Sequence, residues 1–225
     1  MDQSMHELSS VRSLRQAVSL FARRDSPRVF VGATVATAAA RGALGRWGKR
    51  DAAAVSAVVA SRPVAEWLIH RFVLHARPAL VRDHVVDLGA AHRRHHRDPA
   101  DIDFVLVAPR YARQYVVLWA GIAGALAVAR PGRRRRLRPA LSGLTAAYAS
   151  LVAYEWTHFL IHTAWRPRHR WLRKRRAQHR RHHFRNEHYW FGVTVHTADR
   201  ILRTYPAKDD VPLSPTARNL GADLA

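Results

Sequence analysis

The stretch "AAAVSAVVASRPVAEWLIHRFVLH", from Ala52 to His75, decides the fold. It is rich in Ala, Val and Leu, and Pro63 is its one turn signal, so its composition favours a helix. Its 24 residues are enough to cross a bilayer, which takes about 20 predominantly apolar residues. The stretch ends on His70 and His75, so an apolar helix carries a pair of imidazoles at one end.

Three further apolar stretches, at residues 29–45, 115–129 and 140–165, have the same helical character. The short connections "RWGKR" and "RPGRRRRLRP" join the four stretches in pairs. The first and third stretches are shorter than a full span, so buried helices of a soluble domain remain the alternative. Because few other amphipathic elements could cover such apolar helices, we predict an all-α fold with four transmembrane or membrane-embedded helices in two hairpins.

The distribution of arginines predicts an orientation. If Met1 lies in the cytoplasm, the basic polar segments 76–113 and 166–225 lie there too, as the positive-inside rule favours. The loop 130–138 holds six arginines and would then face the other side. Either the hairpins are re-entrant or these arginines bind lipid headgroups, and the sequence leaves both open. Residues 1–28 are polar and lack the apolar core of a cleaved signal peptide.

The composition excludes some chemistry. The chain has no cysteine, which removes disulfides, thiolate zinc sites, iron–sulfur clusters and cysteine nucleophiles. The formal charge of +22 favours an anionic partner, either nucleic acid or a membrane surface. A GC-rich genome also produces many arginines, so the charge is weak evidence for a ligand. It does not account for 15 histidines, which call for a chemical reason.

The histidines follow an internal repeat. The word "HRRHH" occurs at residues 92–96 and again at 179–183, an offset of 87 residues. The same offset places His75 on His162 and Phe72 on Phe159, while His70 and His158 nearly match. Each half therefore consists of an apolar helix that ends in two histidines, sixteen further residues, and HRRHH.

Helical geometry predicts which side chains meet. At about 100° per residue, positions i, i+3 and i+4 share one face, so the three histidines of each HRRHH word are expected to converge. His158 and His162 stack for the same reason. His70 and His75 are five apart and would point about 140° away from each other on an ideal helix. For both to reach one site, the helix must end, bulge or tighten near residues 71–74.

Two readings of HRRHH compete. As a nucleic-acid patch, its arginines would contact phosphates and its histidines would be incidental. Such a patch does not need paired histidines at the end of an apolar helix, whereas a metal site does. Imidazole suits iron, zinc, copper and nickel, and metal-bound histidines usually donate their other ring N–H to an outer acceptor. We expect Glu66, Glu155 and Asp199 as such acceptors; Asp98, Asp101 and Glu187 are also near in sequence.

The segments "HRFVLH", "HRRHH", "HFLIH" and "HRRHH", in this order and spacing, resemble the integral-membrane fatty acid hydroxylase / sterol desaturase superfamily. The gap between His70 and His75 and the later run "HHFRNEHYWFGVTVHTADRILRT" are most similar to the fatty acid 2-hydroxylases. The resemblance covers about residues 60–205 and implies a membrane domain with a cytosolic helical cap that holds two metal ions. The implied ligands are His70, His75, His92, His95, His96, His158, His162, His179, His182 and His183.

The resemblance also implies an activity: O2-dependent hydroxylation of a lipid acyl chain by a membrane-bound di-iron enzyme with its site on the cytoplasmic side. Zinc could occupy the site in purified protein, and electrons would come from a separate ferredoxin or similar donor. Desaturation and sterol or carotenoid hydroxylation use the same histidine pattern. A non-redox membrane metal-binding protein is the alternative of another class, and we expect no nucleic-acid partner.

The expected organisation has three parts. A polar segment, 1–28, precedes a membrane hydroxylase domain, 29–205, and an irregular tail, 206–225, follows it. His188 and His196 have no partner in the first half; they either line the substrate channel or, as we expect, are ordinary polar residues. His6, His84 and His169 fit no spacing and are expected at the surface.

Overall fold

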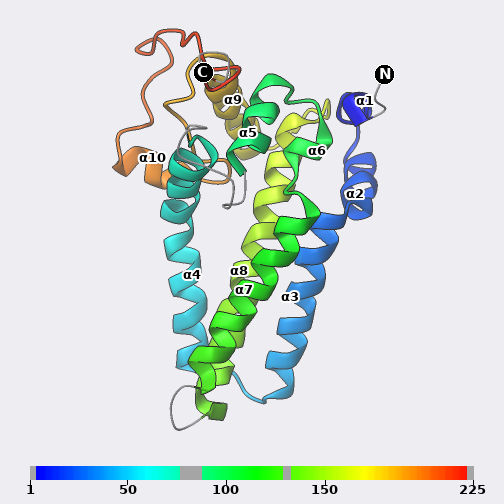
Figure 1. Cartoon of the computed structure of the whole chain (residues 1–225), viewed down its shortest axis with the longest axis vertical. Coiled ribbons are helices and arrows are strands. Elements are labelled where there is room, and N and C mark those ends of the chain that lie inside the picture. Colours follow the sequence, from blue (N-terminus) through cyan, green and yellow to red (C-terminus); the bar gives the residue numbers. More distant parts are fainter. Residues whose placement is uncertain (1–3, 77–87, 129–132, 222–225) are drawn as a thin grey trace. The chain divides into compact units, whose positions relative to one another are not determined.

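The structure is a computed structural model that describes residues 4–76, 88–128 and 133–221 (Figure 1). Every regular element within these ranges is a helix, which confirms the all-α prediction. His84 and residues 130–132 of the arginine-rich loop lie outside the described residues. The chain divides into two compact units. Unit 1 comprises residues 1–20, 63–106 and 156–225, and unit 2 comprises residues 21–62 and 107–155.

Unit 2 is a bundle built from the four apolar stretches. It contains α3 (Asp25–Ala43), most of α4 (Lys49–Leu68), α7 (Pro109–Val128) and most of α8 (Arg133–His162), which run alongside one another in Figure 1. Thr145 of α8 donates to Thr37 of α3 at 3.0 Å, and the Tyr148 hydroxyl donates to the Val116 carbonyl of α7 at 2.8 Å. Hydrogen bonds of this kind hold apolar helices together where the surroundings are also apolar and the hydrophobic effect between helices is small.

A buried ion pair closes the turn between α3 and α4. The Arg41 guanidinium donates to both carboxylate oxygens of Asp51, at 2.7 and 2.9 Å, and Ser142 of α8 donates to the same carboxylate at 2.7 Å. Arg41 also donates to the carbonyls of Gly45 and Arg46. Because each buried charge has several partners, the pair fixes the turn and ties it to α8.

Glu155 lies in unit 2, where it anchors two segments. One carboxylate oxygen accepts from the Ser26 hydroxyl at 2.6 Å and from the Val107 amide at 2.9 Å. Glu155 was expected to accept a hydrogen bond from a histidine ring. In the structure it accepts instead from Ser26 and Val107, both within the bundle. The physical reason is local: Val107 lies just before α7, where its amide needs an acceptor.

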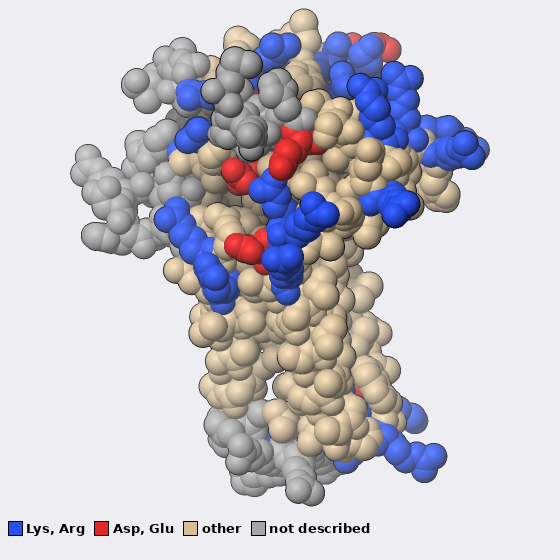
Figure 2. Space-filling view, turned by 90° about the vertical axis from the view of Figure 1, so that its right-hand side faces the viewer, with Lys and Arg blue, Asp and Glu red and all other residues tan. Residues whose placement is uncertain are grey.

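The surface of unit 2 is apolar along its helices. The helical run Lys49–Leu74 is the one stretch in the described ranges that is long and apolar enough to cross a membrane, and only 11% of its most apolar window is buried. Large apolar side chains are exposed on α3, α4 and α7, among them Val35, Val59 and Val117. Figure 2 shows this part of the molecule with few charged side chains along the helices and basic ones where the helices end.

Unit 1 gathers the shorter helices around the ends of α4 and α8. They are α1 (Ser4–Ser10), the π-helix η1 (Ile69–Leu74), α5 (Leu88–Arg97), α6 (Ile102–Val105), α9 (Arg170–Phe184) and α10 (Thr197–Ile201), and α2 (Leu14–Arg23) begins in this unit. Leu8 of the polar N-terminal segment is fully buried, and its carbonyl accepts from the Ala164 amide at 3.1 Å. After α10 the described chain, to residue 221, has no helix or strand.

Candidate metal centre

The helix that carries His70 and His75 widens into a π-turn between them. Residues 69–74 form η1, in which the His75 amide donates to the carbonyl of His70, five residues earlier, at 3.2 Å. The extra residue in this turn brings the two imidazoles together, with ring centroids 4.9 Å apart. This confirms the predicted distortion near residues 71–74, and the distortion is a bulge of the kind often found at functional sites.

All ten predicted histidines meet in unit 1, in two groups. The first histidine group is His70, His75, His92, His96 and His182; the second is His95, His158, His162, His179 and His183. Within each group, one ring nitrogen from every member lies within 4.8 Å of the others. The groups share a border, where the His96 and His183 rings stack with centroids 4.1 Å apart.

The two HRRHH words do not each serve one group, which corrects the expectation that their histidines converge. His92 and His96 belong to the first group, whereas His95 belongs to the second. His182, the residue that matches His95 in the repeat, lies in the second half of the chain but belongs to the first group. The reason is that adjacent helical residues point about 100° apart, so His95 and His96 face different centres. Each group therefore takes four histidines from one half of the chain and one from the other.

The spacing within each group fits a metal ion. In the second group, Nε2 of His179 lies 3.1 Å from that of His158, 2.9 Å from that of His162 and 3.0 Å from that of His183. Nitrogens bound at about 2.1 Å and at right angles lie about 3.0 Å apart. In the first group, His70 and His92 show the same 3.0 Å separation between Nε2 atoms. The all-imidazole donor set suits iron, zinc, copper or nickel.

Main-chain carbonyls fix the outer nitrogens of four of these rings. Nδ1 donates to a carbonyl oxygen in His70 (Phe191, 2.5 Å), His96 (Ala217, 2.7 Å), His158 (Val105, 2.9 Å) and His182 (Tyr189, 2.7 Å). A carbonyl can only accept, so Nδ1 carries the proton and Nε2 presents its lone pair to the group. Carboxylates were expected in this role. Main-chain carbonyls fill it at these four positions, one at the end of α6 (Val105) and three in irregular segments.

Burial keeps the imidazoles of α5 and α9 uncharged. Burial, and then repulsion from neighbouring imidazoles, holds the pKa of His92, His95, His179, His182 and His183 well below the usual value. Burial lowers the pKa of His96 to about 3, although its bond to the Ala217 carbonyl acts in the opposite direction. These six rings are therefore neutral at pH 7, which is the form that binds metals.

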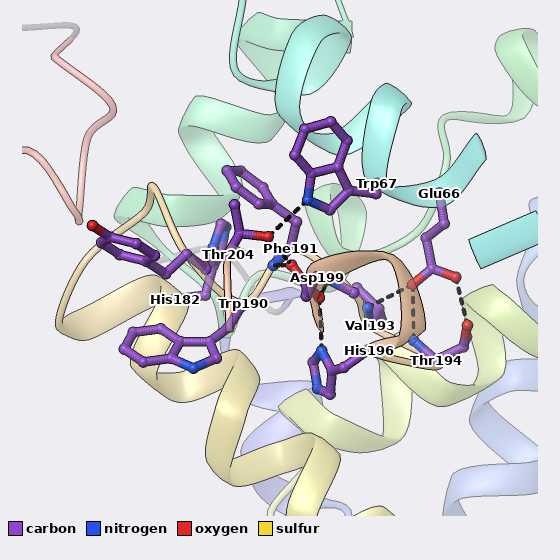
Figure 3. Close-up of polar contacts among 12 residues, drawn as sticks. Glu66, Trp67, His182, Trp190, Phe191, Val193, Thr194, His196, Asp199 and Thr204 are labelled. Carbon is purple, nitrogen blue, oxygen red and sulfur yellow. Dashed lines mark hydrogen bonds and ion pairs between the residues drawn. The ribbon is translucent and has the colours of Figure 1, made fainter. Parts of the chain in front are cut away.

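Asp199 organises the loop that holds the first histidine group (Figure 3). Its carboxylate accepts from the amides of Phe191 and Gly192 and from the Thr204 hydroxyl, at 2.7 to 2.9 Å. His196 Nδ1 lies 2.9 Å from the same carboxylate. Burial alone raises the pKa of Asp199, but hydrogen bonds from His196, Thr204 and Gly192 outweigh it, so the pKa is lowered. Asp199 thus acts on His70 through the Phe191 carbonyl.

Glu66 holds the next two residues of the same loop. Its carboxylate accepts from the amides of Val193 and Thr194 and from the Thr194 hydroxyl (Figure 3). Nearby, Trp67 Nε1 donates at 2.9 Å to the Thr204 hydroxyl that bonds Asp199. Glu66 and Asp199 were expected to accept from the rings of metal-binding histidines, but both bind the loop backbone, and the one ring that pairs with Asp199 is His196, which belongs to neither group. They position the loop, and the loop carbonyls position the rings.

Gly192 is required where this loop turns. A Cβ at this position would lie 2.0 Å from the Val195 carbonyl oxygen and 2.8 Å from the Asp199 carboxylate. Both distances are shorter than van der Waals contact, so any side chain would push the loop away from Asp199. The neighbouring Phe191 ring packs against His70, His75 and His182, with centroid distances of 5.5 Å to each, and covers one side of the first group.

The sequence model of the fatty acid hydroxylase family matches residues 55–204, which is 150 of 225 residues. The chain belongs to the fatty acid hydroxylase family. The match contains all ten histidines and the loop held by Glu66 and Asp199. The resemblance inferred from the histidine segments is thereby confirmed.

The chain is also similar to two individual proteins. It is 26% identical over 144 residues to fatty acid 2-hydroxylase of Rattus norvegicus, a match that covers 63% of this chain and 36% of the rat protein. A solved structure of full-length Scs7p, with only the hydroxylase domain visible, superposes with a TM-score of 0.56 at 22% identity. That likeness covers 84% of this chain and 68% of Scs7p, and it shows the fold. The chain spans about a third of the rat relative's length.

The remaining described histidines of the chain belong to neither group. His196 is buried beside Asp199, and burial lowers its pKa more than Asp199 raises it. His188 is exposed, and His169 is exposed and caps α9 by accepting from the Trp171 amide at 3.3 Å. The side chain of His6 lies outside the described residues.

The sequence did not predict four backbone acceptors of the centre, because a carbonyl that accepts a hydrogen bond leaves no mark on residue type. They are the carbonyls of Val105, Tyr189, Phe191 and Ala217.

Proposed function

We propose that this protein is a membrane-bound, O2-dependent di-iron hydroxylase that acts on a lipid acyl chain, as a fatty acid 2-hydroxylase does. The observation that carries the proposal is the pair of five-histidine groups in a chain of the fatty acid hydroxylase family. A structural zinc site needs four ligands, and ten imidazoles in two adjoining groups exceed that need. A protein that only binds metal does not need its two groups in direct contact, as they are where His96 stacks on His183.

The metals would be held by the ten histidines, and bound iron would supply the activation of dioxygen. The protein residues have three tasks. The carbonyls of Phe191, Tyr189 and Ala217 keep Nε2 of the first group directed inward. Burial keeps the rings neutral. The Phe191 ring excludes water from one side of the group.

The reaction needs an external source of electrons. Insertion of one oxygen atom into a C–H bond consumes O2, two electrons and two protons, and yields the alcohol and water. The chain has no cysteine and so no iron–sulfur cluster of its own. We therefore infer a separate electron donor, a ferredoxin or a similar protein.

The membrane placement rests on unit 2. We propose that α3, α4, α7 and α8 are embedded as two hairpins. The support is the apolar run Lys49–Leu74 and the exposed apolar side chains of α3 and α7. The active site is placed on the cytoplasmic side because the positive-inside rule assigns the basic segments of unit 1 to that side.

The function is tested with the purified protein in lipid vesicles, a ferredoxin with its reductase, and ¹⁸O2. We expect one ¹⁸O atom per product in a hydroxylated acyl chain, detected by mass spectrometry. His182→Ala should abolish the product, because His182 belongs to the first group. His169→Ala, at an exposed capping residue, should retain it. A new double bond without ¹⁸O would identify a desaturase instead, and an active His182→Ala variant would contradict the site.

A further inference from the structure

We propose that the described part of the C-terminal tail, residues 206–221, is a positioning element of the first histidine group. The family match ends at residue 204, so the tail lies beyond the matched residues. Nevertheless, the Ala217 carbonyl accepts from Nδ1 of His96 at 2.7 Å. Ala217 is 3% exposed and His96 is 1% exposed, so water does not compete freely for this hydrogen bond.

The tail is fastened beside the second HRRHH word. Arg185 Nε donates to the Val211 carbonyl at 2.7 Å, and the Ser214 amide donates to the Arg185 carbonyl at 2.7 Å. The Thr216 hydroxyl donates to the Glu187 carboxylate, one residue before Ala217. Val211 and Glu187 are both buried. These contacts hold residues 211–217 against the segment that directly follows α9, and they bring the Ala217 carbonyl to His96.

The hydrogen bond to Ala217 determines which ring nitrogen His96 presents to the first histidine group. Because Nδ1 donates to the carbonyl, Nε2 is the unprotonated nitrogen, and it is buried with no protein partner. The ring also stacks on His183 of the second group, so its orientation matters at the border of both groups. Without the carbonyl, the ring could turn over or exchange its proton between nitrogens. Loss of such an outer partner typically weakens metal binding about 10- to 100-fold.

The inference rests on the proposed function and is tested on the chain of residues 1–225 loaded with Fe²⁺ or Co²⁺. A chain ended after Asp210 loses the Ala217 carbonyl, whereas a control chain ended after Gly221 keeps every described contact. Chelator titration should show two tight metals in the control. In the shorter chain, one metal should bind about 10- to 100-fold more weakly while the other is unchanged. The visible spectrum of the Co²⁺ form should change for one ion.

Two further variants separate positioning from general destabilisation. Thr216→Val removes the hydrogen bond from the Thr216 hydroxyl to Glu187, so this variant should also bind one of the two metals more weakly. Glu187→Gln keeps an acceptor for that hydroxyl, so this variant should bind both metals as tightly as the control chain. A synthetic peptide of residues 211–221, the part that the truncation removes, should restore tight binding of the weakened metal to the shorter chain. Unchanged affinity for both metals after truncation, or equal weakening of both, would overturn the inference. Absence of metal from the intact protein would instead overturn the proposed function.

Discussion

Pairs of adjacent histidines near the ends of α5 and α9 contribute to both histidine groups. His95 and His96 point about 100° apart and so supply two different groups, as His182 and His183 do. The sequence spacing was sufficient to find all ten histidines. It was not sufficient to find their outer partners, because the carbonyls of Phe191 and Ala217 come from segments without periodicity.

Asp199 offers a prediction at this scale. Asp199→Ala leaves buried amides of Phe191 and Gly192 without an acceptor, which should lower the free energy of unfolding by about 3 kcal/mol. The displaced Phe191 carbonyl should also weaken metal binding to the first group. Thermal unfolding and metal content of the detergent-purified protein measure both effects.

Asp209→Ala provides the control for Asp199→Ala, since this carboxylate is exposed on the tail. It should change the free energy of unfolding by less than about 0.5 kcal/mol. Equal behaviour of the two variants would contradict the role given to Asp199.

The π-turn η1 is the feature that matters at the scale of elements. The long apolar helices and the distortion between His70 and His75 followed from composition and spacing, because both depend on local geometry. The sequence predicted two hairpins, but not which helices of one hairpin neighbour those of the other. Those neighbours depend on contacts such as Thr37 with Thr145, whose partners are distant in sequence.

Deletion of Phe72 tests the π-turn. The deletion leaves His70 and His75 four residues apart, within about 40° on a regular helix, as His158 and His162 already are. We expect both metals to be retained, because the π-turn accommodates one extra residue that the shorter helix no longer contains. Metal analysis of the purified variant gives the answer.

Phe72→Ala is the matched control, because it removes the ring but keeps the residue count. It should also retain both metals, since Phe72 is 59% exposed. If the deletion loses one metal and Phe72→Ala does not, the five-residue spacing itself is needed and the interpretation of η1 is wrong.

The duplication joins the two halves at the scale of the whole molecule. Each group draws one histidine from the other half, so neither half contains a complete set. The offset of 87 residues revealed the repeat, and the resemblance to the family rested on the order and spacing of the repeated histidine segments. The exchange of His95 and His182 did not follow, because positions i, i+3 and i+4 share one broad helix face, and only the packing of the helices divides that face between two groups.

Stability of the metal-free protein should depend steeply on pH. The six histidines of α5 and α9 have lowered pKa values in the folded protein, so below about pH 6.5 the unfolded chain takes up protons that the folded chain refuses. Each should lower the free energy of unfolding by about 1.4 kcal/mol per pH unit, until its folded pKa is reached. Above pH 6.5 this contribution is constant.

Tryptophan fluorescence from pH 8 to pH 4 can follow this transition. With six such groups, the metal-free protein should unfold within about two pH units below 6.5, since folded domains are stable by about 5–15 kcal/mol. The metal-loaded protein should stay folded to lower pH, because bound metal keeps the rings neutral. A metal-free protein that remains folded at pH 4 would show that these rings are not buried as described.

The central claim, two metals each bound across both halves, is tested most directly by metal content in two double variants. His75→Ala/His182→Ala removes two ligands from the first group, and His95→Ala/His182→Ala removes one from each. From a wild-type value of about two irons per chain, the first variant should keep about one and the second should lose both on mild chelation. Equal loss in the two variants, or a wild-type protein without tightly bound metal, would contradict the account.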